Sequence, residues 1–131
     1  MAGFNRFPEI VAKFGPAVSQ IVRKSAFDVQ ALYAATCARD TGFMANSAYV
    51  VTSKESTYGQ GGVTPPKGAY LLPEHAKPED EYTAHIAVGA NYAIFPEMGT
   101  RYQPAQPAFY PAVDSVEPSF MAAMGKLEDA L

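Results

Sequence analysis

The sequence predicts an α+β fold, in which a small antiparallel sheet is packed on one face by an N-terminal helix and a C-terminal helix. Apolar residues recur at helical spacing near both ends of the chain, and two segments between them have the β-branched and aromatic content of strands. A long region rich in Gly and Pro separates these two segments. The chain has 131 residues, of which 48% are hydrophobic, so we expect a single domain over 1–131.

The first predicted element is a short helix that begins near Pro8. Its apolar face follows the spacing i, i+3, i+4 and i+7 and consists of Phe7, Ile10, Val11 and Phe14. Gly15 and Pro16 are expected to interrupt it, because proline lacks the N–H that a helix interior needs and fits best in a first turn. From Pro16 a longer helix continues to about Ala38, with the apolar stripe Val18, Ile21, Val22, Val29, Leu32 and Tyr33. The turn Asp40-Thr41-Gly42 ends it.

Two strands follow, over Tyr49–Thr52 and Tyr82–Val88. The connection between them, about residues 55–80, is crowded with Gly and Pro and is too long for an ordinary hairpin loop. We therefore expect an extended arm or hairpin used in assembly, with a disordered surface loop as the alternative. Within it, residues 69–72 are expected to form a short strand or an apolar anchor.

The predicted C-terminal part begins with a short helix over Tyr92–Met98, which packs Tyr92, Ile94 and Phe95 onto the sheet and ends at Gly99. A Pro-spaced loop over 102–107 follows. Pro107 or Pro111 then opens the C-terminal helix, which is expected to kink at Pro118. The apolar positions of this helix are Val113, Val116, Phe120, Met121, Met124 and Leu127.

Charge and cysteine content exclude several classes of function. A net charge of -3, a pI near 5.3 and the absence of a Lys/Arg run argue against specific nucleic-acid binding. The single cysteine, Cys37, cannot form an intramolecular disulfide and is expected to be a small buried hydrophobe. No apolar run reaches the length of ~20 residues that spans a bilayer, and no signal-peptide pattern opens the chain, so we expect a soluble protein without membrane partners.

Few residues have a pattern that fits catalysis or ligand binding. Asp-Thr-Gly at 40–42 is also the catalytic triplet of aspartic proteases, so a homodimeric protease using Asp40 is an alternative function, although its helical context favours a structural turn. His75 and His85 lack the spacing of metal ligands and are expected at the surface. The glycines at 59, 61 and 62 lack the remainder of a phosphate-binding loop. No metal or cofactor is therefore predicted.

One segment carries a resemblance to a known family. Residues 91–112 read NYAIFPEMGTRYQPAQPAFYPA. This resembles the "YA..vE.GT…QP(F).PA" pattern of the minor tail component, or tail-completion and head-to-tail joining, family of long-tailed phages. The matching residues are Tyr92, Ala93, Glu97, Gly99, Thr100, Gln106, Pro107, Phe109, Pro111 and Ala112. Upstream, Asp40-Thr41-Gly42 followed by Ser47 resembles the family's "dTG.l..S" segment. The chain departs from the pattern at Phe43, at Met98 and at the extra residue Ala108.

The resemblance implies a structural virion protein of a tailed phage and no enzyme activity. Such a protein completes the head-proximal end of the tail and joins it to the head connector as a hexameric ring; a tail terminator, which stops tail-tube polymerisation, is the alternative. Its partners would be further copies of itself, the tail terminator or tail-tube protein, and the connector or adaptor proteins of the head. DNA would pass through the ring without specific binding. The expected location is the virion neck, after assembly in the host cytoplasm.

The arm and the loop after Gly99 are the predicted assembly surfaces, because a monomer gains little from tyrosines in loops and aromatic residues are favoured at interfaces. Ordinary packing of the loops onto the core is the alternative. Glu97 and Arg101 could pair across the turn between them, cap exposed backbone groups, or lie at a subunit interface. The candidate residues are Tyr58, Gly61, Gly62, Tyr70, Leu71, Leu72, Glu97, Arg101, Tyr102, Gln106, Phe109 and Tyr110.

Overall fold

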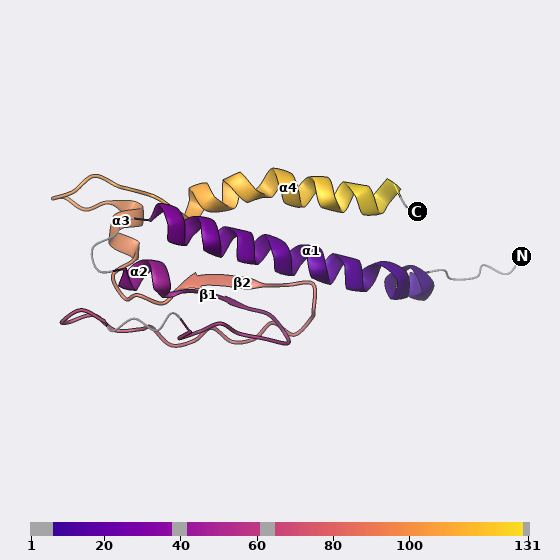
Figure 1. The fold of residues 1–131 in the computed structure, drawn as a ribbon, viewed down its shortest axis with the longest axis horizontal. Helices are drawn as coiled ribbons and strands as arrows, with labels where there is room; N and C mark the ends of the chain where they lie inside the picture. Colours follow the sequence, from indigo (N-terminus) through magenta and orange to yellow (C-terminus); the bar gives the residue numbers. More distant parts are fainter. Residues whose placement is uncertain (1–6, 38–41, 61–64, 130–131) are drawn as a thin grey trace, which may run out of the picture.

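Two long helices and a two-stranded sheet lie along the length of the molecule (Figure 1). The computed structural model describes residues 7–37, 42–60 and 65–129. The elements in chain order are α1 (Phe7–Thr36), α2 (Phe43–Asn46), β1 (Ala48–Val51), β2 (His85–Val88), α3 (Ile94–Met98) and α4 (Phe109–Asp129). The predicted α+β class, with one helix at each end of the chain and a long connection between the strands, is confirmed.

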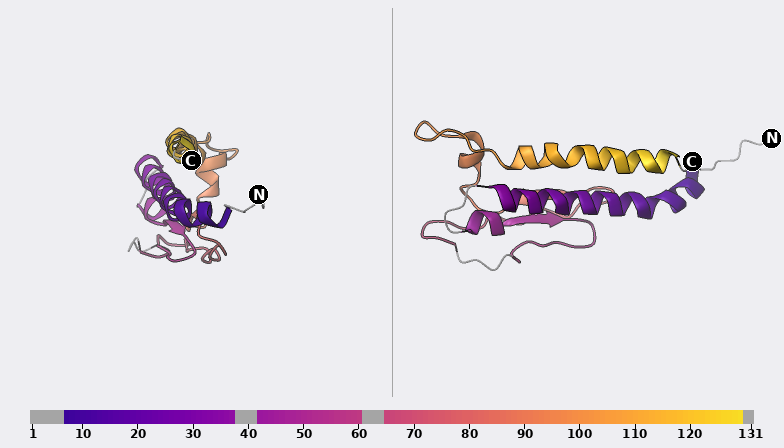
Figure 2. Two further views of the ribbon diagram at one scale, coloured as in Figure 1. Left: turned by 90° about the vertical axis from the view of Figure 1, so that its right-hand side faces the viewer. Right: turned by 45° about the horizontal axis from the view of Figure 1, so that its top comes forward.

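The elements are stacked in layers, with α1 in the central position. It contacts both strands on one side and α4 on the other, while the described parts of the connection between the strands run along the opposite face of the sheet (Figures 1 and 2). All residues of β1 are consequently buried, and Val50 and Val51 are completely inaccessible to solvent. A two-stranded sheet is marginal by itself, so its stability depends on being covered on both faces.

The two strands pair antiparallel, with Ala48 opposite Val88 and Val51 opposite His85. The second strand was expected to begin at Tyr82, but it begins at His85. The carboxylate of Asp80 accepts hydrogen bonds from the backbone N–H of Tyr82 and from the hydroxyl of Thr83, so the chain before His85 is held in a turn.

The predicted break at Gly15 and Pro16 is wrong, because α1 is one helix of 30 residues with Pro16 inside it. A proline in a helix interior removes one hydrogen bond and crowds the preceding turn, and α1 curves near its N-terminal end (Figure 2). Gly15 is buried, and a Cβ atom there would lie only 2.8 Å from the hydroxyl oxygen of Tyr82. The missing side chain therefore makes room for Tyr82.

The end of α1 also differs slightly from expectation. The helix ends at Thr36 rather than near Ala38. The predicted turn at Asp40-Thr41-Gly42 lies mostly outside the described residues, but Gly42 is described and has a left-handed conformation, with φ of 81°. It immediately precedes α2, a helix of 4 residues that is too short to show a period in the sequence.

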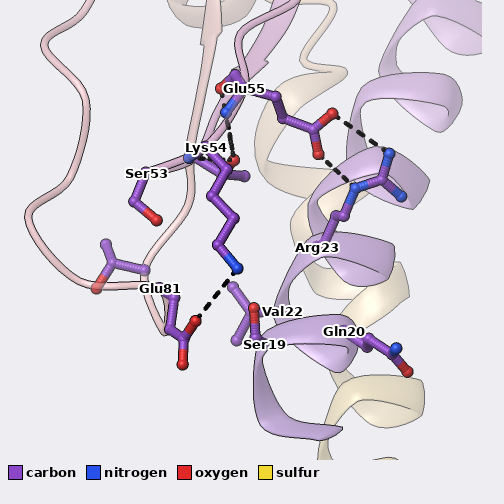
Figure 3. Close-up of a pocket in the computed structure, with 10 residues that line it drawn as sticks. Ser19, Gln20, Val22, Arg23, Ser53, Lys54, Glu55 and Glu81 are labelled. Atoms are coloured by element: carbon purple, nitrogen blue, oxygen red, sulfur yellow. Dashed lines mark hydrogen bonds and ion pairs between the residues drawn. The ribbon is translucent and has the colours of Figure 1, made fainter. Parts of the chain in front are cut away.

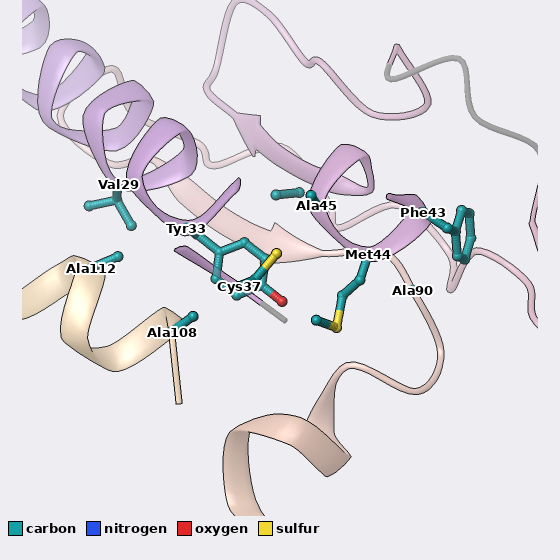
Figure 4. Packing of buried hydrophobic residues seen from close by; sticks show 10 residues of the cluster. Val29, Tyr33, Cys37, Phe43, Met44, Ala45, Ala90, Ala108 and Ala112 are labelled. Carbon is teal, nitrogen blue, oxygen red and sulfur yellow. The ribbon is translucent and has the colours of Figure 1, made fainter. Parts of the chain in front are cut away.

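The core forms where α1, α2 and the start of α4 meet (Figure 4). Its larger buried side chains come from α1 and α2, whereas α4 contributes Ala112, and the half-buried Phe109, Val113 and Val116 pack against the cluster. Cys37 is buried among them, as the sequence predicts. The buried cluster consists of Val29, Tyr33, Cys37, Phe43, Met44, Ala45, Ala48, Ala90, Ala108 and Ala112.

The described parts of the arm lie against the sheet. The ring of Tyr58 meets the ring of Tyr49 edge-on, with 4.9 Å between centroids, and its hydroxyl donates to the carbonyl of Leu72. The hydroxyl of Tyr49 accepts a hydrogen bond of 3.0 Å from the backbone N–H of His75. Tyr58 therefore contributes to the packing of the monomer.

The short helix α3 does not pack as predicted. Tyr92 is half-buried against the core, but Ile94 and Phe95 are 59% and 56% exposed, because α3 lies at the end of the molecule beyond the sheet (Figure 1). Gly99 ends it, as expected, with φ of 80°. The helix α4 begins at Phe109, between the two predicted prolines, and continues through Pro118. Within the described ranges, no helix is both long and apolar enough to cross a membrane.

Two glycine substitutions should have opposite effects on stability. A Cβ atom at Gly89 would lie 2.9 Å from a methyl group of Leu71 and 3.2 Å from the carbonyl oxygen of Ser47, so Gly89→Ala should lower the free energy of unfolding by about 1–3 kcal/mol. Gly125 lies inside α4 with open space around it, so Gly125→Ala should raise it by about 0.5–1 kcal/mol. Urea unfolding of both variants and the native chain measures the difference. Equal midpoints for the two variants would contradict the close packing at Gly89.

Candidate functional site

The segment with the family resemblance forms the end of the molecule where α3 meets α4. Its central interaction is made by the carboxylate of Glu97. One oxygen accepts hydrogen bonds of 2.9 Å from the backbone N–H groups of Ala108 and Phe109, and the other accepts one of 3.2 Å from Tyr110. These N–H groups open α4 and have no partner inside the helix, so Glu97 caps α4 from a distant position in the chain.

The capping hydrogen bonds also keep the carboxyl of Glu97 ionised. Burial raises the pKa of the carboxyl, but the hydrogen bonds from Phe109, Ala108 and Tyr110 outweigh burial, so the pKa is lowered below its ordinary value. The pKa of the nearby Tyr33 phenol is raised, because burial and the neighbouring charges favour its neutral form. Glu97 is therefore a fixed negative charge at the positive end of the α4 dipole.

The loop between α3 and α4 is a closed, hydrogen-bonded structure. The backbone groups of Thr100 and Gln103 bond to each other in both directions, and the Thr100 hydroxyl accepts from the N–H groups of Tyr102 and Gln103. The N–H of Gln106 donates to the carbonyl of Pro96 at 2.7 Å. A Cβ atom at Gly99 would lie 2.8 Å from the nitrogen of Ala105, so only glycine permits this approach.

Large apolar side chains project from this end into solvent. We define the end surface as the exposed large apolar and aromatic residues of α3, of the loop and of the first turn of α4. They are Ile94 at 59%, Phe95 at 56%, Met98 at 67%, Tyr102 at 83% and Tyr110 at 64% exposure. Soluble monomers rarely leave a group of such residues uncovered without a functional reason.

A groove of about 320 Å³ opens within the end surface. Ile94 and Met98 of α3 and Tyr110 of α4 form its rim, together with Leu72 of the arm. Tyr33 and Ala90 close its buried side. The groove joins parts of the chain that are far apart in sequence, which is a property the sequence alone does not reveal.

The structure brings most of the candidate assembly residues together. Leu72, Glu97, Phe109 and Tyr110 line the groove, while Arg101, Tyr102 and Gln106 lie in the adjoining loop. Tyr70 and Leu71 pair with the chain just after β2, beside Ala90. Tyr58 does not line the groove; its ring packs on Tyr49 and its hydroxyl donates to the carbonyl of Leu72. Gly61 and Gly62 lie outside the described residues, as does Asp40 of the alternative protease site.

Arg101 and Glu97 have separate partners. The guanidinium of Arg101 lies over the ring of Tyr102, 5.2 Å from its centroid, while Glu97 caps α4. Of the roles that the sequence left open for Glu97, backbone capping is the one observed. The extra residue Ala108 donates one of the capped N–H groups and is buried, so the local packing accommodates this departure from the family pattern.

Ser47, which follows the Asp40-Thr41-Gly42 turn in the sequence, has a structural role that the sequence did not indicate. Ser47 is buried between α2 and β1, and its hydroxyl donates to the carbonyl of Met44 and accepts from the N–H of Ala90 at 3.0 Å. Its carbonyl accepts from the N–H of Gly89. Ser47 thus connects the beginning of β1 to the segment that leads into α3.

The other polar clusters show ion pairing and ring packing. A groove of about 350 Å³ beside α1 is crossed by ion pairs from Arg23 to Glu55 and from Lys54 to Glu81 (Figure 3). The rings of His75 and His85 lie 4.9 Å apart, a proximity that sequence spacing did not predict. Among the residues that the structure describes, no group of three or more His, Cys, Asp or Glu is arranged to hold a metal ion.

Removing the charge of Glu97 should destabilise the protein in a pH-dependent way. The pKa is lower in the folded state, so the stabilisation is complete above the unfolded pKa of about 4.3 and is lost as the pH falls through the folded pKa. We expect Glu97→Gln to lower the free energy of unfolding by about 1–2 kcal/mol at pH 7, and by less in acid.

Urea unfolding at several pH values measures this difference. Glu79→Gln is the matched control, because Glu79 is an exposed carboxylate in the arm, away from the first turn of α4. A deficit for Glu97→Gln that is the same at pH 3 and pH 7 would contradict the charged cap.

Comparisons with known proteins found no protein similar to this chain. The chain matches no protein-family model, no curated protein and no solved structure.

Proposed function

We propose that the protein is a structural virion component of a long-tailed phage, which completes the head-proximal end of the tail and joins it to the head connector as a hexameric ring. The observation that carries the proposal is the end surface. The segment that resembles the tail-completion family folds into a hydrogen-bonded loop and leaves large apolar side chains in solvent. Assembly would remove this surface from water.

The segment over 91–112, which carries the resemblance, contains two groups of residues with different roles. Glu97, Gly99 and Thr100 hold the loop and the start of α4 in place. Their neighbours Met98, Tyr102 and Tyr110 are presented outward. A surface that is held rigid before binding loses little conformational entropy on association, which is what a docking surface requires.

The partners follow from the position in the tail. Other copies of the chain would form the ring, the tail terminator or tail-tube protein would lie below it, and the connector or adaptor proteins of the head would lie above it. A net charge of -3 is compatible with a conduit through which DNA passes without being held.

Loss of the protein should leave heads and tails unjoined. We expect negative-stain electron microscopy of lysates from phage unable to make it to show filled heads beside separate tails of normal length. Supplying the native gene in trans should restore infectious particles, whereas Met98→Glu, which places a charge in the end surface, should not.

Other outcomes of this experiment have definite meanings. Overlong tails would mean that the protein is a tail terminator and not a joining protein. Intact and infectious virions without the protein would overturn a role in the neck.

A further inference from the structure

We propose that the tip of the loop in one copy inserts into a groove between α1, β2 and α4 of the next copy. The loop tip is Arg101 with Tyr102. This inference rests on the proposed ring and specifies which two surfaces of the chain form its interface. The two surfaces differ in composition, as a head-to-tail contact between identical subunits requires.

The loop tip has the properties of an inserting residue. The side chain of Tyr102 is 83% exposed, which is the largest value among the exposed large hydrophobic residues described. The turn beneath it is closed by the paired backbone groups of Thr100 and Gln103 and by the Thr100 hydroxyl. Tyrosine buries a large area at a low cost in side-chain entropy, so a tyrosine on a rigid turn is suited to binding in a pocket.

The receiving groove has a volume of about 370 Å³ and lies on the side of the molecule. Its walls are mostly apolar and come from Val22 and Val29 of α1, Ile86 of β2, and Val113, Val116 and Phe120 of α4. Most of these side chains are only half-buried, so the monomer leaves this apolar floor accessible. A volume in this range accommodates a small ligand and therefore one aromatic side chain.

The charges of the two surfaces are complementary. Arg101 is the only Lys or Arg between Tyr82 and Gly125 in the sequence. Glu117 is exposed and lines the groove, and Asp114 is exposed on the preceding turn of α4. A pair between Arg101 and Glu117 would therefore orient the tip, while burial of Tyr102 would supply most of the affinity, since exposed ion pairs contribute little.

The contact must form between copies, because the loop cannot reach its own groove. The loop lies beyond the N-terminal end of α4 and points away from the helices (Figure 1). Along α4, Val116 is about 10 Å from Phe109, at 1.5 Å per residue, so the groove lies well away from the loop. A chain with its tip at one place and its groove at another can form closed rings.

A charge exchange tests the pairing. Sedimentation velocity of the purified full chain should show self-association that Arg101→Glu and Glu117→Arg each weaken about tenfold, and that the double variant restores. Both residues are exposed, so the variants should remain folded. A chain that stays monomeric at all concentrations, or an oligomer that neither substitution weakens, would overturn the proposal.

Mixing two association-deficient variants tests the head-to-tail geometry. Tyr102→Ser removes the aromatic ring of the loop tip, and Val116→Glu places a charge in the groove. If Val116→Glu fails to fold, Ser25→Phe replaces it, because a phenylalanine there fills the groove from α1. Each variant alone should be monomeric, and an equimolar mixture should form a one-to-one dimer that grows no further. A mixture that stays monomeric, or that forms complete oligomers, would overturn the proposal.

The outcomes of these experiments distinguish a failure of this interface from a failure of the proposed neck function. An oligomer that ignores the Arg101 and Glu117 substitutions overturns this interface but leaves the neck function in place. Intact virions without the protein overturn the neck function, while the association of the purified chain would still stand.

Discussion

The carboxylate of Glu97 determines the structure of the end of the molecule where α3 meets α4. A helix that begins after a proline-rich loop has N–H groups without partners, and in α4 these groups are satisfied by a residue that precedes the loop. The same contact therefore closes the loop and fixes the first turn of α4. It also ties α3 to α4, so the exposed residues of both helices form one surface and not two independent ones. The presentation of Tyr102 and Tyr110 depends on it.

The sheet shows a second dependence. A sheet of two strands is at best marginally stable in water, and here α1 covers one face and the arm covers the other. The edge-on contact of Tyr58 with Tyr49 and the hydrogen bond from His75 to Tyr49 place the arm in the structure of the monomer. A connection that looked too long for a loop is thus explained in part by its covering role, whatever further role it has in assembly.

Period and composition were enough to predict the α+β class, the long helices and the two strands, because these depend on local patterns. The break at Pro16 was wrong, since the packing of a 30-residue helix offsets the loss of one hydrogen bond. The burial of Ile94 and Phe95 was wrong because an apolar residue does not show whether anything covers it. The cap by Glu97, the position of Ser47 and the proximity of His75 to His85 join residues far apart in the chain, so no local pattern indicates them.

The position of the cap determines where the sequence of this chain can vary during evolution. Because the carboxylate that starts α4 comes from before the loop and the helix begins directly after it, residues 101–105 lie between two fixed points. Exchanges of the exposed side chains at positions 101 and 102 leave the backbone pairing of Thr100 with Gln103, the capping carboxylate and the core unaltered. A lineage could therefore alter the tip to follow a changing neighbour while keeping the same scaffold, and variation would concentrate there.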